Sequence, residues 1–282
     1  MSTPEMRTVT LPSGEAISAL GVGTWHMAED PGCRAEELAA LRLGLDLGMA
    51  LIDTAEMYAE GAAEELVGEA IVGRRDEVFL VSKVLPAHAT FHGTLEACEA
   101  SLRRLRTDRL DLYLLHWRGR VPIEETVRAF RALVDKGAIR YWGVSNFDVA
   151  DLAELMDLRG GAEVQTDQVL YNLTRRGIEF DLLPWCRKHH IPIMAYSPIE
   201  QGRLLNHPAV RGVAARHGVT PAQVALAWVL REDGISAIPK AGNRAHVRHN
   251  RAALGLRLTQ ADLASLDPAF PLPTRPQPLE ML

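Results

Sequence analysis

Four residues whose side chains can transfer or stabilise a proton fall at the ends of short apolar runs or just beyond them. Asp53, Lys83 and His116 each end such a run, and Tyr58 follows a few residues after Asp53. A barrel of parallel strands gathers the residues at its strand ends at one mouth. We therefore expect these four side chains to converge.

These residue types suit the delivery of a proton to a carbonyl oxygen. A tyrosine is a weak acid, with an ordinary pKa of about 10. A nearby ammonium group stabilises the phenolate and lowers that pKa, and a carboxylate keeps the ammonium charged. We therefore expect Asp53 and Lys83 to tune Tyr58 as the acid of a proton relay. His116 can donate a hydrogen bond to the carbonyl oxygen, which orients it and stabilises the negative charge that develops there.

The elements that must position these residues alternate along the chain between short apolar runs and longer amphipathic segments. Eight runs are predicted as strands: Ile17–Gly23, Leu51–Ala55, Val78–Val84, Leu110–His116, Ile139–Ser145, Glu163–Val169, Ile191–Ser197 and Ile235–Lys240. Predicted helices between them include Arg34–Gly48, Gly93–Leu105, Glu124–Lys136 and Pro221–Arg231. This repetition predicts an α/β fold of the (β/α)8, or TIM-barrel, type.

The two ends of the chain add to the predicted barrel. An opening β-hairpin is expected to turn at Pro12–Gly14, and the proline-rich segment 270–282 is expected to form an irregular tail. No linker or composition break divides residues 1–282, so we predict a single domain. The rival fold is an open doubly wound sheet, but Gly21–Thr24 lacks the third glycine of a phosphate-binding turn.

Composition limits the classes of partner. The 282 residues are 47% hydrophobic and 24% charged, with a net charge of -5 and a pI of about 6.1. Such a chain has no basic field for nucleic acid or an anionic membrane, so we expect small-molecule partners. The first ten residues contain no apolar signal core, and no apolar stretch is long enough to span a bilayer, which favours the cytoplasm.

The potential metal ligands do not cluster. The three cysteines, Cys33, Cys98 and Cys186, lie far apart and are expected to be reduced thiols in the core. The histidine pairs at 189–190 and 246–249 have no acidic or cysteine ligand nearby in sequence. We therefore predict no metal site.

An ordered set of short motifs closely resembles the aldo-keto reductase superfamily. The motifs are Gly21–Trp25 (GVGTW), Asp53–Tyr58 (DTAEMY), Lys83, Leu112–Trp117 (LYLLHW), Gly143–Phe147 (GVSNF), Ala195–Pro198 (AYSP) and Ile238–Lys240 (IPK). Together they span nearly the whole chain. The resemblance implies a (β/α)8 barrel that binds an extended nicotinamide dinucleotide across its strand ends and transfers hydride to an aldehyde or ketone.

The resemblance also implies a role for each matching residue. Tyr58 is the general acid, Lys83 and Asp53 tune it, and His116 orients the carbonyl. A glutamate at the position of His116 is associated in the family with reduction of carbon–carbon double bonds, so the histidine points to carbonyl reduction. Trp25 and Trp117, with Tyr58 and His116, would wall the substrate pocket.

The coenzyme contacts implied in the same way follow the strand ends. Ser145, Asn146 and Gln168 match the positions that hold the carboxamide, and Tyr196 matches the aromatic residue that stacks on the nicotinamide. The loop that resembles the pyrophosphate clasp holds Ser197, Pro198, Ile199, Gln201 and Gly202. The remaining implied contacts are Gly23, Thr24, Trp25, Asp53, Pro239, Lys240, Ala241, Gly242, Asn243, His246 and Asn250, and Lys240 matches the contact to the adenosine phosphate.

One position departs from the family pattern. Members selective for the 2′-phosphate usually carry an arginine six residues after the lysine, whereas this chain has His246, with Asn250 retained. Neutral histidine holds phosphate weakly, although Arg244 or Arg248 can substitute. We predict NADPH as the coenzyme, with NADH as the alternative.

The sequence also allows two other functions. A Schiff-base lyase would use Lys83 as its nucleophile, but Asp53 opposes this by keeping the lysine charged. A coenzyme-binding redox sensor or regulatory subunit would bind the dinucleotide without useful turnover. For the reductase, the short segment Trp117–Arg120 after His116 and the brief tail predict an open pocket for small or varied aldehydes.

Overall fold

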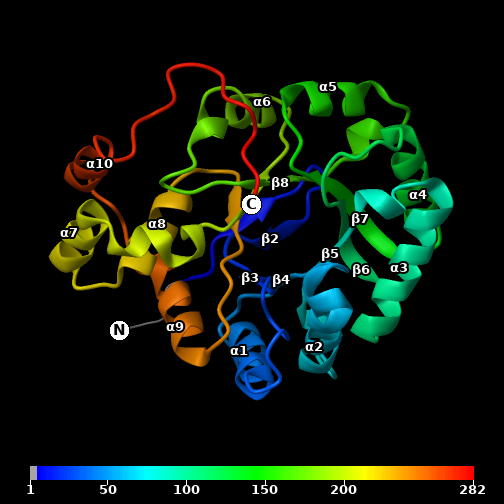
Figure 1. Ribbon diagram of the computed structural model, residues 1–282, viewed down its shortest axis with the longest axis horizontal. Helices are drawn as coiled ribbons and strands as arrows, with labels where there is room; N and C mark the ends of the chain where they lie inside the picture. Colours follow the sequence, from blue (N-terminus) through cyan, green and yellow to red (C-terminus); the bar gives the residue numbers. More distant parts are fainter. Residues whose placement is uncertain (1–4) are drawn as a thin grey trace.

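Eight parallel strands curl into a closed barrel in the computed structural model, which describes residues 5–282 (Figure 1). In chain order and in sheet order they are β3 (Val22–Gly23), β4 (Leu51–Asp53), β5 (Phe79–Val84), β6 (Leu110–Leu115), β7 (Ile139–Ser145), β8 (Asp167–Leu170), β9 (Ile193–Tyr196) and β10 (Ile235–Ala237). The last strand returns to the first, because the Gly21 amide donates to the Ala237 carbonyl at 2.9 Å and the Gly23 amide to the Pro239 carbonyl at 3.1 Å. Closure excludes the open doubly wound sheet.

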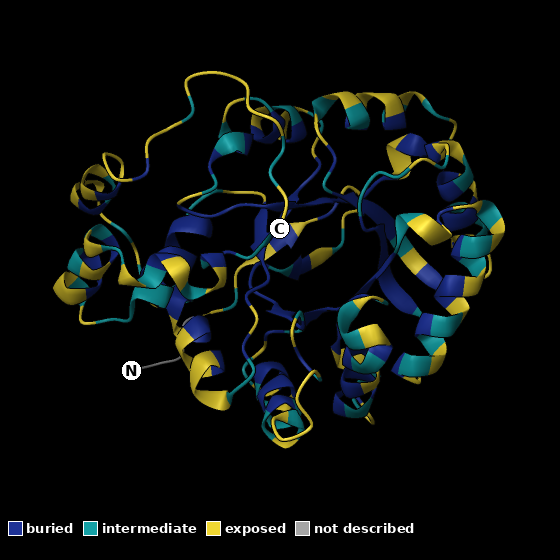
Figure 2. Cartoon of the chain, in the orientation of Figure 1, coloured by how far each residue is buried: buried dark blue, intermediate teal, exposed yellow. Residues whose placement is uncertain are grey.

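The helices surround this barrel and connect its strands. They are α1 (Arg34–Asp46), α2 (Ala62–Ala70), α3 (Phe91–Leu105), α4 (Ile123–Asp135), α5 (Val149–Asp157), α6 (Leu182–Lys188), α7 (Pro208–His217), α8 (Pro221–Val229), α9 (Arg244–Ala252) and α10 (Gln260–Leu266). Short 3-10 helices lie between them: η1 (Tyr58–Gly61), η2 (Arg75–Glu77), η3 (Pro86–His88), η4 (Gly161–Glu163), η5 (Gly177–Glu179), η6 (Glu200–Asn206) and η7 (Ala253–Gly255). Figure 2 shows the buried barrel strands and the exposed outer faces of the helices.

Local sequence sets the helix boundaries. Helix α3 begins two residues before the predicted Gly93, because the Thr90 side chain caps it by accepting a hydrogen bond from the Gly93 amide at 3.1 Å. Helix α8 begins at the predicted Pro221, where the proline occupies the first turn behind a Thr220 capping box. No helix within residues 5–282 is long and apolar enough to cross a membrane.

The predicted hairpin is confirmed at the end of the barrel opposite the strand carboxyl ends. Strands β1 (Thr8–Thr10) and β2 (Ala16–Ser18) pair antiparallel, and Gly14 turns with a φ of 88°. The Ser13 amide donates to Gln165 Oε1 at 2.9 Å, just before β8 begins. The hairpin therefore covers the amino-terminal end of the strands and leaves the other mouth accessible.

Two predicted strands differ from the structure. The predicted strand Ile17–Gly23 is wrong as one element, since it divides into β2 and β3. Gly21 lies between these strands, and a Cβ there would come within 2.5 Å of the Leu51 side chain. Glu163 was expected to begin a strand, but it ends η4, and β8 begins only at Asp167.

Several other predicted strands extend too far at their carboxyl ends. Ala55, His116, Ser197 and Lys240 lie in the loops that follow their strands. Three of these loop residues, His116, Ser197 and Lys240, line the cavity at the barrel mouth.

The cysteine prediction is partly wrong. All three thiols are free, and Cys98 and Cys186 are buried in the core. Cys33 is instead exposed just before α1, where its Sγ donates to Asp30 Oδ2 at 3.4 Å. The helical pattern of the following residues did not reveal that the chain turns to the surface there.

Candidate active site

A cavity of about 560 Å³ opens at the carboxyl ends of the strands. Its lining brings together most of the residues expected at the site: Gly23, Trp25, Asp53, Tyr58, His116, Trp117, Ser145, Asn146, Gln168, Tyr196, Ser197, Pro198, Ile199, Gln201, Gly202, Lys240 and His246. Other expected residues lie outside the lining: Thr24, Lys83, Pro239, Ala241, Gly242, Asn243 and Asn250. The cavity therefore extends from the expected proton relay to the expected phosphate-binding residues.

The relay residues form one continuous set of hydrogen bonds. Lys83 Nζ donates to Asp53 Oδ2 at 2.7 Å, to the Thr54 carbonyl at 2.9 Å and to the Tyr58 hydroxyl at 3.1 Å. The second carboxylate oxygen of Asp53 accepts from Gln168 Nε2 at 2.8 Å. Lys83 is fully buried and lies outside the cavity lining, which it reaches through its bonds to Asp53 and Tyr58.

Burial and the neighbouring charges together set the pKa values of the relay residues. Burial raises the pKa of Tyr58 above its ordinary value, although the Lys83 ammonium opposes the shift. The expected net lowering of the Tyr58 pKa is therefore wrong, because the sequence shows the neighbouring charge but not the loss of solvent. Burial lowers the pKa of Lys83, but Asp53 and Tyr58 reverse this and leave the Lys83 pKa raised. At neutral pH the site thus holds a protonated tyrosine beside a charged lysine.

His116 lies next to the tyrosine as a neutral side chain. Its ring centroid is 5.8 Å from that of Tyr58 at an angle of 75°. Burial, and then the Lys83 charge, lower the His116 pKa to about 2. Among residues 5–282, its Nδ1 atom has no hydrogen-bond partner. A neutral imidazole can donate one hydrogen bond to a carbonyl oxygen without itself becoming a competing acid.

An amide cluster forms the next part of the cavity. Asn146 Nδ2 donates to the His116 carbonyl and to Ser145 Oγ, both at 3.1 Å. The Tyr196 hydroxyl donates to Asn146 Oδ1 at 2.9 Å. Gln168, on the neighbouring strand, is buried and fixed by Asp53. These groups match the chemistry of a carboxamide, which both donates and accepts hydrogen bonds.

The coenzyme loop, which we define as residues 197–202, has an unusual backbone. Ser197, Glu200 and Gln201 have φ angles of 45°, 49° and 53°, which L-residues adopt rarely. Asn172 Nδ2 holds this loop by donating to the Ser197 carbonyl at 2.9 Å and to Glu200 Oε2 at 2.8 Å. The loop is therefore fixed in a curved shape along one side of the cavity.

Basic residues gather at the far end of the cavity, on and before α9. Lys240 and His246 line it, and His246 is held by Asn243, which caps α9. Arg244 is bound to Glu36, with Nη2 to Oε2 at 2.9 Å. Arg248 is exposed, and its Nη1 lies 3.5 Å from the Arg244 carbonyl. Arg248 is therefore the better placed of the two arginines to meet a phosphate.

Sequence reasoning missed several lining residues, namely His26, Met57, Leu205, Ile238, Met281 and Leu282. His26 has a φ of 62° and stacks on Trp25 with ring centroids 4.2 Å apart. Its position next to the GVGTW motif was the one available signal. Across residues 5–282, no group of three or more histidine, cysteine, aspartate or glutamate side chains is arranged to hold a metal ion.

Comparison with known proteins identifies relatives over the whole chain. A family model described as the aldo/keto reductase family matches residues 19–269. The chain is 52% identical over 283 aligned residues to methylglyoxal reductase YeaE of Escherichia coli, covering 99% of this chain and 100% of that protein. It is also 34% identical to glyoxal reductase of Bacillus subtilis, covering 95% and 94% of the two chains.

Solved structures agree with this relationship. An aldo/keto reductase from Klebsiella pneumoniae, in complex with NADP and acetate, is 51% identical and superposes with a TM-score of 0.96 over 99% of this chain and 100% of that chain. A second structure of an aldo-keto reductase from Klebsiella pneumoniae, with the same identity, coverage and TM-score, contains NADPH.

Proposed function

The chain belongs to the aldo/keto reductase family and is an NADPH-dependent oxidoreductase that reduces carbonyl groups, and on that premise we propose that its substrates are small 2-oxoaldehydes such as methylglyoxal. The observation that carries this proposal is the 52% identity to a methylglyoxal reductase over the full length of both chains. The glyoxal reductase relative supports the same class of substrate.

We propose that the residues at the barrel mouth divide the chemistry among them. The coenzyme, when bound, supplies the hydride that adds to the carbonyl carbon. Tyr58 donates its proton to the carbonyl oxygen, and Lys83, 3.1 Å away, stabilises the phenolate that remains. Asp53 keeps Lys83 charged, so the relay can be reloaded with a proton from solvent. His116 donates a hydrogen bond to the same oxygen and stabilises its developing charge.

The fit of an extended dinucleotide rests on the order of chemical groups along the cavity. Amide donors and acceptors at Asn146 and Gln168, with the Tyr196 ring, lie beside the relay and suit the nicotinamide. The coenzyme loop lies along the cavity, and Lys240 and His246 lie where the adenosine phosphate is expected. We propose that Arg248 supplies the positive charge that family members selective for the 2′-phosphate place at the position of His246.

The test is coenzyme oxidation followed by absorbance at 340 nm. With NADPH, we expect methylglyoxal and glyoxal to be reduced, and Tyr58→Phe to remove turnover while leaving NADPH binding intact. Binding of NADPH without oxidation by any carbonyl would favour the redox-sensor alternative. Trapping of a substrate on Lys83 by borohydride, without coenzyme turnover, would favour the lyase.

We further propose that the protein works in the cytoplasm. The support is chemical: three free thiols, two of them buried, suit a reducing compartment. Fractionation of cells expressing the natural protein tests this, and recovery in a membrane or secreted fraction would contradict it.

A further inference from the structure

The last residues of the chain, 276–282, form a segment that we call the C-terminal strap. It passes across the barrel mouth and ends over the strands (Figure 1). Its two terminal residues, Met281 and Leu282, line the active-site cavity, and the Leu282 backbone lies close to the Tyr196 hydroxyl. The strap is therefore part of the pocket wall, although it contains no helix or strand.

The strap gives the pocket an apolar rim. Met281 is 55% exposed, Leu282 is 48% exposed, and Met57, on the opposite loop, is 42% exposed. Apolar surface of this kind gains free energy when a ligand removes it from water. A carbonyl substrate with an apolar chain would cover this rim, whereas methylglyoxal is too small to do so.

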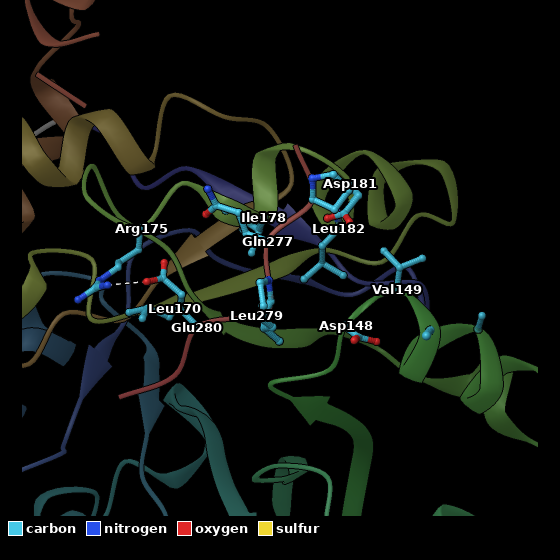
Figure 3. Close-up of a pocket in the computed structure, with 15 residues that line it drawn as sticks. Asp148, Val149, Leu170, Arg175, Ile178, Asp181, Leu182, Gln277, Leu279 and Glu280 are labelled. Atoms are coloured by element: carbon cyan, nitrogen blue, oxygen red, sulfur yellow. Dashed lines mark hydrogen bonds and ion pairs between the residues drawn. The ribbon is translucent and has the colours of Figure 1, made fainter. Parts of the chain in front are cut away.

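One arginine connects the strap to the coenzyme loop. Arg175 Nη1 donates to Glu280 Oε1 of the strap at 2.5 Å (Figure 3). Its Nη2 and Nε donate to Glu200 Oε1 at 3.1 and 3.3 Å. Glu200 belongs to the coenzyme loop, and its side chain is only 5% exposed. Although burial opposes it, the Arg175 and Asn172 hydrogen bonds hold the Glu200 pKa below its ordinary value, so Glu200 is a fixed negative charge.

Beyond this ion pair, the strap is held by Leu279, which packs against the hydrophobic core, and by the approach of the Leu282 backbone to Tyr196. A second cavity of about 560 Å³ lies on its other side, between residues 276–280 and the amino-terminal turns of α5 and α6 (Figure 3). Residues 276–278 are exposed, and Leu279 and Glu280 are only partly buried. The strap therefore rests on few contacts, and its only ion pair within the described part of the chain is the one between Glu280 and Arg175.

From this arrangement we propose that Arg175 is a positioning residue that couples the coenzyme loop to the C-terminal strap, and that the strap end thereby discriminates among carbonyl substrates by the length of their apolar chains. The proposal rests on the proposed reductase function. Arginine suits this role because its planar guanidinium presents donors in fixed directions along separate edges, whereas a lysine ammonium is a compact point charge.

Kinetics of three variants test the discrimination. In Glu280→Gln and Arg175→Lys, we expect the KM for hexanal to rise by about fivefold, which is near the effect of losing one or two methylene contacts, with kcat and the KM for methylglyoxal nearly unchanged. The matched control is Arg203→Gln, because Arg203 bonds to the same Glu200 at 3.0 Å but does not contact the strap. The control should leave the hexanal KM unchanged. Equal KM changes for both substrates would overturn the proposal.

Truncation of the chain distinguishes the effect of the two terminal side chains from the effect of the Glu280 charge. A chain ending at Glu280, without Met281 and Leu282, should show the same rise in the hexanal KM. Adding Glu280→Gln to the truncated chain should then have almost no further effect, because the two changes act on one contact. Full additivity of the two changes would show that Glu280 acts by another route.

A measurement that does not depend on enzyme turnover tests the coupling separately from the proposed function. Carboxypeptidase A removes apolar terminal residues, and intact mass spectrometry follows the loss of Leu282 and Met281. We expect faster trimming in Glu280→Gln and Arg175→Lys than in the wild type or Arg203→Gln, and slower trimming with saturating NADPH in the wild type only. Equal rates in all four proteins, or no effect of NADPH on the wild type, would overturn the coupling. Failure of the wild type to oxidise NADPH would overturn the proposed function alone.

Discussion

Replacing Asp53 by asparagine tests the electrostatic account of the relay. Lys83 is fully buried, and its partners are Asp53 Oδ2 at 2.7 Å, the Thr54 carbonyl at 2.9 Å and the Tyr58 hydroxyl at 3.1 Å. Only Asp53 neutralises its charge. Asparagine offers one acceptor oxygen for two donors, Lys83 and Gln168, which donates to Asp53 Oδ1 at 2.8 Å. Leaving a buried charge without its partner costs about 3–5 kcal/mol, and we expect a loss of that size at pH 7.

The pH dependence of this loss has a defined sign. In the wild type the folded pKa of Lys83 is raised, so its contribution to stability is complete at neutral pH and is lost only as the pH rises through that raised pKa. In Asp53→Asn, burial is no longer opposed by the carboxylate, so the Lys83 pKa falls below its unfolded value of about 10.4. The folded variant then binds fewer protons than the unfolded chain, and its stability rises with pH. The difference between the two proteins should therefore narrow from pH 7 to about pH 9.5.

Urea unfolding followed by tryptophan fluorescence measures both quantities, since Trp142 and Trp228 are buried in the core. The matched control is Asp76→Asn, which removes an exposed carboxylate paired with Arg109 and should leave the midpoint almost unchanged. A loss smaller than about 1 kcal/mol for Asp53→Asn would refute the account, because a buried lysine charge left unpaired costs more than that. A difference that stays constant with pH would refute the assignment of the effect to Lys83.

Three single substitutions and one labelling experiment on the unchanged protein give four further predictions. Tyr58→Phe should lower kcat by about 10² to 10⁴ while the Kd for NADPH, from tryptophan quenching, changes little; a kcat near that of the wild type would remove Tyr58 as the acid. Because the folded pKa of His116 is lowered to about 2, the wild type loses stability as the pH falls below about 6.5, the pKa of an unfolded histidine. In urea titrations between pH 6.5 and 4, His116→Gln should therefore lose less stability than the wild type. Equal losses in the two proteins would contradict this. Arg248→Ala should weaken binding of NADPH by about tenfold, or about 1.4 kcal/mol, without affecting NADH, whereas equal effects on both would exclude a contact to the 2′-phosphate. Titration with a thiol reagent should label Cys33 alone in the folded protein, and rapid labelling of a second thiol would contradict the burial of the others.

The relay could be predicted from sequence because its residues are set by a local rule. Apolar runs become buried strands, and the first polar residues after such runs must lie at the mouth of a parallel barrel. Asp53 and Lys83 follow this rule, and the structure places them 2.7 Å apart. Their protonation could not be predicted in the same way. It depends on how much solvent the whole fold removes from Tyr58, and no pattern near that residue carries this information.

The strap shows the opposite case. Met281 and Leu282 lie in a segment without helical or strand periodicity, so the sequence gives no face or register to place them. The ion pair that ties their segment to the barrel joins residues 105 positions apart, Arg175 and Glu280. An arginine and a glutamate at such a separation are too common in sequences to indicate a contact. The lining of the pocket by the chain terminus could therefore be found only from the structure.

Several residues that are expected to contact the coenzyme have a strained backbone. Asn146, Ser197 and Gln201 have positive φ angles, at a cost of about 1–2 kcal/mol for each residue that is not glycine. Asn146 keeps this conformation because its backbone N–H donates to the Gln168 carbonyl at 2.9 Å. Ser197 keeps it because its backbone carbonyl accepts from Asn172 Nδ2 at 2.9 Å. Both restraints come from β8 or the loop that follows it. Two of the strained positions along the coenzyme groove are thus held in place by a neighbouring strand or its loop. Positive φ angles also occur at Ala59 and Glu60, directly after Tyr58, so the segment that carries the expected acid is itself a strained turn.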